Sequence, residues 1–197
     1  EFKNKQVGDA LQRIGKVKVD AFEPILGSAN VFEYRNKLEF SFSHRRWLTQ
    51  EEVDSGQVFD DVPSLGFHVP GRWDKVLDVK ECHLMAEPSN AVRNRVRDIA
   101  LANEFSYYNL NEQTGFLRNL IVRSTMTGEW MVILSVAEDR PADVKLILDT
   151  LVAEFPQLTS VLWVFNDKPN DTIADLDILV HHGNDHIMEE MEGLKFR

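Results

Sequence analysis

The chain has 197 residues, 43% of them hydrophobic, with a net charge of −10 and a single cysteine. These values allow a sizeable folded core, exclude an intrachain disulfide and argue against a general nucleic-acid coating protein. Without a long apolar run or a signal-peptide pattern, no membrane association is predicted and the cytoplasm is the simplest compartment.

The charge is unevenly distributed along the chain. Residues 1–50 hold nine Lys or Arg against six acids, a net of +3, which leaves −13 for the remainder. A basic end and an acidic end fit selective contact with a polyanion, although solvated surfaces also produce such runs. The chain opens without Met inside a helical pattern and stops inside an alternating segment, so we expect a piece of a longer protein.

The first predicted elements are a helix and a strand. Apolar residues recur at helical spacing from Lys3 to Ile14 and Gly15 ends the pattern, which predicts a helical arm over 1–16 and one domain over 17–197. The strand is predicted over 33–43, with one mostly apolar face and one charged face; the apolar face comprises Tyr34, Asn36, Leu38, Phe40 and Phe42.

The middle of the chain begins with an acidic loop formed by Glu51, Glu52, Asp54, Asp60 and Asp61. Short strands are predicted near 65–69 and 75–79, followed by a helix over 88–103 whose Arg93 and Arg97 are expected to be solvated.

The last third predicts a hairpin, a crossover and a meander. Strands over 116–124 and 129–136 flank a turn, and a helix over 139–155 leads to a strand over 159–165. The chain then ends in a meander over 173–180 and 187–196 that turns at 181–185. The fold class expected is α+β, with a mixed, mostly antiparallel sheet, helices and one strand–helix–strand crossover.

Catalytic signatures are missing from the sequence. It has no glycine-rich phosphate loop, no Gly-x-Ser-x-Gly and no paired His-Glu zinc motif. His181, His182 and His186 lie near Asp185, but a polar turn favours solvated side chains over three or four converging metal ligands. Cys82 alone is most often a small buried hydrophobe, or else one ligand of a site completed elsewhere.

Basic residues on and after the first strand are the most specific binding candidates. Arg35 and Lys37 project from one strand face, and Arg45-Arg46-Trp47 follows it. Arginine binds phosphate and an aromatic ring stacks an unpaired base, but cross-strand charge pairing explains the pattern equally well. Arg72-Trp73, expected in a loop, has the same ambiguity. Arg118 and Arg123 fall on opposite faces of an apolar strand, so one is able to reach a ligand.

Four stretches together resemble the RNA (uracil-5-)-methyltransferase family, chiefly its ribosomal-RNA type. They are Phe32–Phe40, Leu65–His68, Asp78–Cys82 and Gly115–Arg123 followed by Thr127-Gly128-Glu129, in matching order and spacing. The closing segment 187–196 resembles the part just before the methyltransferase domain of such enzymes, so the likeness spans nearly the whole chain.

The resemblance implies a central RNA-recognition domain that positions ribosomal RNA, or alternatively transfer RNA, for methylation of uracil C5. It implies S-adenosylmethionine as cofactor, held with the catalytic cysteine and carboxylate in a domain after Arg197, so this chain alone is expected to be inactive. Cys82 matches the last of four ligands of a 4Fe-4S cluster, and the other three would precede Glu1. RNA contacts are assigned to Arg35, Lys37, Arg45, Arg46 and Arg118. The alternative is a non-catalytic RNA-binding or assembly module with the same fold; the oligomeric state is left open.

Overall fold

The computed structural model describes residues 1–59 and 62–197, so Asp60 and Asp61 of the acidic loop lie outside the described residues. The chain divides into two compact units, 1–31 and 32–197, whereas the sequence pattern suggested a boundary after residue 16. In the first unit, helix α1 (Phe2–Asp9) continues into a π-helical turn, η1 (Ala10–Ile14), and ends at Gly15 as predicted.

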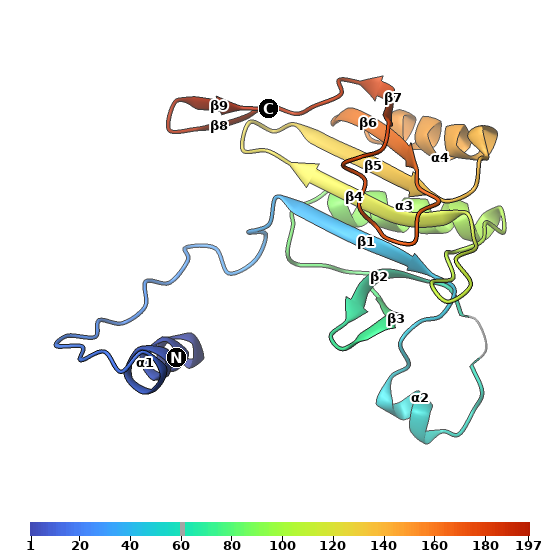
Figure 1. Ribbon diagram of the computed structural model, residues 1–197. Helices are drawn as coiled ribbons and strands as arrows, with labels where there is room; N and C mark the ends of the chain where they lie inside the picture. Colours follow the sequence, from blue (N-terminus) through green and yellow to red (C-terminus); the bar gives the residue numbers. More distant parts are fainter. Residues whose placement is uncertain (60–61) are drawn as a thin grey trace. The chain divides into compact units, whose positions relative to one another are not determined.

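The second unit is built on a seven-stranded sheet in its described residues, with strand order β3-β2-β1-β4-β5-β6-β7 (Figure 1). Neighbouring strands are antiparallel except for β5 and β6, which are parallel and joined through helix α4 (Pro141–Glu154). This arrangement confirms the predicted fold class. The strands are β1 (Lys37–Ser43), β2 (Ser64–Val69), β3 (Arg72–Asp78), β4 (Leu117–Ser124), β5 (Trp130–Val136), β6 (Leu158–Phe165) and β7 (Ile178–Gly183).

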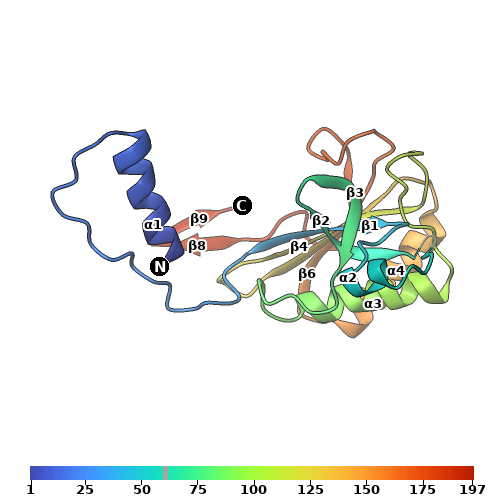
Figure 2. The same cartoon turned by 90° about the horizontal axis from the view of Figure 1, so that it is seen from below.

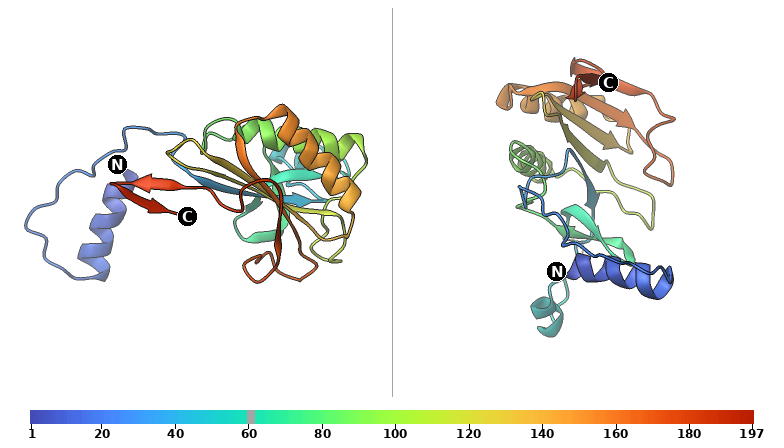
Figure 3. Two further views of the ribbon diagram at one scale, coloured as in Figure 1. Left: turned by 90° about the horizontal axis from the view of Figure 1, so that it is seen from above. Right: turned by 90° about the vertical axis from the view of Figure 1, so that its left-hand side faces the viewer.

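Helix α3 (Ser89–Ala102) and α4 lie on the same face of this sheet (Figures 2 and 3). The main core fills the space between helices and sheet because β1 turns its alternate apolar residues toward α3; it includes Leu38, Phe40, Phe42, Val92, Val96, Ile147 and Leu151. No helix of the described residues covers the opposite face. It carries a smaller apolar cluster of Ile121, Met131, Ile133, Leu162 and Val164, partly covered by Ile173, Leu176 and Ile187.

Several predicted boundaries and environments were wrong. The first strand begins at Lys37 rather than residue 33, and Arg35 therefore lies outside it. The acidic loop contains a short helix, α2 (Gln50–Asp54), because Thr49 and Glu52 form a capping box. Arg72 lies in β3 rather than in a loop.

The chain end also differs from the predicted meander. His181 and His182 lie within β7 rather than in the turn. The last two strands, β8 (Glu189–Met191) and β9 (Leu194–Phe196), form a separate hairpin. No helix in the described residues has the length and apolar character needed to cross a bilayer.

The arginines of α3 were expected to be solvated, and this was wrong. Arg93 is fully buried with its guanidinium 4.9 Å from the Phe40 ring centroid, and Arg97 is bound to Asp78 at 2.8 Å. Arg93 occupies the same helical stripe as the buried Ser89 and Val96. Position on the helix, rather than residue type, decided its environment.

Candidate functional site

Arg118 does not face a ligand. It is 1% exposed and sits at a register shift between β4 and β5, where a bulge re-aims the side chain. Its Nε donates to Asp171 at 3.0 Å and its Nη1 to the Asn166 carbonyl at 2.9 Å and to the Lys168 carbonyl. Nη2 also lies 3.0 Å from Asp171, without hydrogen-bond alignment. These contacts tie the loop after β6 to β4 and contradict the expected role of Arg118 as an RNA contact.

Lys37 and Arg123 form a basic pair on the helix-free face. They are direct cross-strand partners at the edge of the β1–β4 ladder, which places both side chains on one face. The Lys37 ammonium is 3.0 Å from Glu39, whereas the exposed Arg123 has no carboxylate partner among the described residues. Arg35, also exposed, precedes the strand and is held by its main chain, whose N–H donates to the Leu84 carbonyl at 2.9 Å.

A second basic group, the Arg46 cluster (Arg45, Arg46 and Lys75), lines a hollow of about 180 Å³. Glu52 binds the Arg46 guanidinium through both oxygens, one of them 2.7 Å from Nη1. This pairing holds the pKa of Glu52 at about 2. Phosphate binding at Arg46 therefore competes with a fixed carboxylate, and Lys75 adds a cation to the hollow.

The predicted contacts do not converge. Lys37 begins β1 and Arg45 follows its last residue, Ser43, so roughly 20 Å of strand separates the two ends. The structure instead forms two separate basic groups. One is Lys37 with Arg123, and the other is Lys75 with Arg45 and Arg46. From the sequence, Arg123 was only one of two alternatives with Arg118, and Lys75 was not a candidate, because neither becomes part of a basic group until strands pair. Their strand positions were the available signal.

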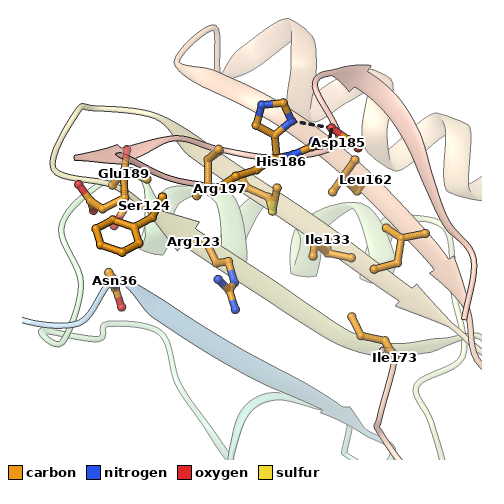
Figure 4. Close-up of a pocket in the computed structure, with 15 residues that line it drawn as sticks. Asn36, Arg123, Ser124, Ile133, Leu162, Ile173, Asp185, His186, Glu189 and Arg197 are labelled. Atoms are coloured by element: carbon orange, nitrogen blue, oxygen red, sulfur yellow. Dashed lines mark hydrogen bonds and ion pairs between the residues drawn. The ribbon is translucent and has the colours of Figure 1, made fainter. Parts of the chain in front are cut away.

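A cavity of about 560 Å³ lies beside the basic pair (Figure 4). Its floor is the small apolar cluster, represented by Met131, Ile133 and Leu162, and Arg123 and Asn36 stand at its rim. A second hollow of about 430 Å³ shares Arg123 with the first and is also lined by Lys37. Arg123 therefore stands between two depressions of the same sheet face.

Most other charged groups around the larger cavity are paired. Arg197 donates to both oxygens of Asp185 at 3.0 and 2.8 Å, and His186 Nδ1 is 2.5 Å from the same carboxylate. The contact with His186, supported by Arg197, lowers the pKa of Asp185. Glu189 accepts the Met126 amide at 2.9 Å. Among the cations that line the cavity, Arg123 is therefore the one that is not paired with a described carboxylate.

Cys82 lies between β3 and α3 and is 6% exposed. Its main-chain N–H donates to Asn90 Oδ1 at 2.8 Å, and Asn90 Nδ2 donates to its carbonyl at 3.1 Å. The thiol belongs to the main core, and one thiol is a single ligand of the four that an iron–sulfur cluster needs. The residues of this chain therefore do not form a cluster site by themselves.

The late histidines are separated rather than convergent. His181 Nε2 lies 2.9 Å from Asp149 of α4, while His186 contacts Asp185. Across residues 1–59 and 62–197, no three His, Cys, Asp or Glu side chains are grouped to hold a metal ion.

Known relatives cover the chain from end to end. A protein of Bacteroides thetaiotaomicron named an uncharacterized RNA methyltransferase is 49% identical over 199 residues, which is 100% of this chain and 44% of the relative. A protein of the same name from Porphyromonas gingivalis is 46% identical over 99% of this chain and 43% of its own length. This chain belongs to the RNA methyltransferase family.

A Chlorobaculum tepidum RNA methyltransferase extends the set at 33% identity, with 100% of this chain and 41% of the relative covered. This chain thus spans less than half the length of these relatives. No family model matches it.

A solved structure shares the fold. The Pyrococcus abyssi tRNA (uracil-54, C5)-methyltransferase, solved with S-adenosyl-L-homocysteine, aligns with a TM-score of 0.63 at 21% identity, over 99% of this chain and 40% of that one. The relatives named above confirm the resemblance seen in the sequence at the level of RNA methyltransferases, and this structure shows the shared fold.

Proposed function

We propose that this chain is the RNA-positioning part of a longer, S-adenosylmethionine-dependent RNA (uracil-5-)-methyltransferase of the cytoplasm. The observation that carries the proposal is the 49% identity to an RNA methyltransferase along the whole of this chain. The uracil-5 specificity is supported by the fold shared with a tRNA (uracil-54, C5)-methyltransferase and by the sequence stretches that resemble that family.

The chemistry explains why a separate positioning part is useful. Uracil C5 becomes nucleophilic only after a thiolate adds at C6, and the base must leave its stack for that addition. S-adenosylmethionine would supply the methyl group, and no sequence pattern in this chain matches its site. The buried Cys82 is not placed to act as the attacking thiolate. This chain would instead hold the RNA on either side of the extruded base.

Two surfaces support the RNA-binding role: the Lys37–Arg123 pair with the neighbouring Arg35, and the Arg46 cluster. Their separation along β1 suits contact with two points of a folded RNA rather than with one phosphate. Ribosomal RNA is the first substrate to test, because Cys82 matches a cluster ligand of the ribosomal-RNA enzymes, and transfer RNA is the second. The cluster itself would require three further ligands from outside this chain.

The test is tritium release from C5-labelled uridine in unmodified ribosomal RNA, using the longer protein that contains this chain and S-adenosylmethionine. Release is expected, with transfer RNA as the parallel substrate. No release from either RNA would favour the non-catalytic RNA-binding module.

The positioning role is tested by charge reversal. The double variant Arg35→Glu/Lys37→Glu should raise KM for RNA by about tenfold or more, since it removes and opposes two phosphate contacts. The matched control is Arg95→Glu/Lys145→Glu on the exposed helical side, where both cations pair with carboxylates. Equal KM values for the two double variants would refute the positioning role of this surface.

A further inference from the structure

The larger cavity of the helix-free face has the form of a ligand site. Its volume of about 560 Å³ falls within the range of about 300 to 1,000 Å³ that small-ligand pockets occupy. Its floor residues Met131, Ile133 and Leu162 are held rigidly by the pairing of β5 with β6. An apolar floor with a few polar groups at the rim is the arrangement that binds a flat, partly polar molecule.

The rim points to an anionic ligand. Asp185 is engaged by Arg197 and His186, and Glu189 by a main-chain amide, so these carboxylates are already satisfied. Arg123 offers a guanidinium without a described carboxylate partner. Asn36 adds an amide side chain at the same rim, able both to donate and to accept hydrogen bonds (Figure 4).

Because Arg123 stands between two hollows, the site suits a ligand larger than a single anion. It lines the larger cavity and the smaller hollow beside Lys37. A phosphate held there would leave a depression on each side for the two nucleosides it connects. The smaller hollow is bordered by the Lys37–Glu39 pair, whereas the larger has the apolar floor suited to a base.

We propose that the helix-free sheet face binds two consecutive unpaired nucleotides, with the linking phosphate on Arg123 and one base on the floor formed by Met131, Ile133 and Leu162. The inference rests on the proposed RNA-positioning function and assigns to it a single-stranded RNA site. Unpaired RNA is the form whose bases are free to enter such a cavity.

The experiment is a methyl NMR titration of this chain with a single-stranded uridine hexanucleotide. The methyl signals of Met131, Ile133 and Leu162 should shift, while those of Ile147 and Leu148 in the helix-covered core should not. A fully paired RNA of equal charge and inorganic phosphate should each leave the floor methyls unmoved, because neither carries a free base.

Affinity measurements give a second readout. Arg123→Gln should weaken hexanucleotide binding about fivefold and reduce the dependence of log K on log salt by about 0.7, the contribution of one phosphate contact to a single strand. Arg95→Gln, which removes the same charge from the helical side, should keep the affinity within about twofold.

The outcomes separate this site from the wider function. Hexanucleotide binding without shifts of the floor methyls, or shifts reproduced by phosphate alone, would overturn the dinucleotide site and leave RNA positioning intact. Absence of hexanucleotide binding at millimolar concentration would also overturn the site, while tritium release by the longer protein decides the proposed function independently.

Discussion

Arg118 and Arg123 lie five residues apart on β4, and we expect their replacement by Met to have opposite consequences. Arg118 is buried and bound by its own chain, whereas Arg123 is exposed at the rim of the large cavity. The long apolar Met side chain removes the charge while keeping much of the volume. Arg118→Met should therefore lower stability, and Arg123→Met should lower RNA affinity.

The magnitude for Arg118→Met follows from its contacts. The variant leaves the carbonyl of the buried Asn166 without its guanidinium donor, which costs about 1–3 kcal/mol. It also removes a cation–π contact at 4.4 Å from the Tyr108 ring centroid, worth about 1–2 kcal/mol when desolvated. The Asp171 side chain is 40% exposed and regains water, so the loss of its ion pair with Arg118 adds little. The total is about 2–5 kcal/mol.

The assay is thermal unfolding of both variants together with RNA affinity at a temperature where each is folded. For a chain of this size, the estimated loss corresponds to a decrease in Tm of roughly 4–20 °C for Arg118→Met. Arg123→Met, at an exposed site, should stay within about 0.5 kcal/mol of the parent chain. An Arg118→Met variant that keeps its Tm but loses RNA affinity would refute the assignment of Arg118 to the interior.

Three further predictions concern single side chains. Arg93→Met should leave the free energy of unfolding in urea unchanged within about 1 kcal/mol or raise it. The reason is that Arg93 Nε and Nη1 lack hydrogen-bond partners among the described residues and burial lowers the pKa of Arg93 to about 10. A loss above about 3 kcal/mol would contradict this. The carboxyl of Glu52 should titrate near pH 2 by NMR. Its pairing with Arg46 therefore stabilises the fold above the usual pKa of 4.5, and this stabilisation is lost as the pH falls toward 2. A midpoint near 4.5 would show that the pair is absent in solution. Gly66→Ala should reduce stability by on the order of 3 kcal/mol, since a Cβ there would lie 2.0 Å from a main-chain oxygen of β3. Gly27→Ala, with open space around it, is the control. Equal stability of the two variants would contradict the strand pairing.

Alternation and helical spacing in the sequence were sufficient to predict most elements. Leu38, Phe40 and Phe42 alternate along β1, and the residues of α4 recur with helical period, because burial on one face of an element imposes its own repeat. The crossover between β5 and β6 followed from the order strand, helix, strand. The family resemblance likewise needed only local stretches in a fixed order.

Local patterns were insufficient for the charged residues, because their environment depends on which elements pack together. Charge alone suggested a solvated Arg93, and an apolar strand flank suggested an Arg118 that reaches a ligand, yet tertiary packing buries both. Conversely, Arg123 joins Lys37 only because β1 and β4 pair in one particular register.

The sequence by itself thus determined the α+β class, the order of elements and the RNA methyltransferase relationship, since each is carried by residues close together along the chain. Only the tertiary structure decided which arginines are interior and which are exposed beside a cavity. That choice depends on partners such as Asn166 for Arg118 and on open space for Arg123, and both are set by contacts between segments distant in the chain.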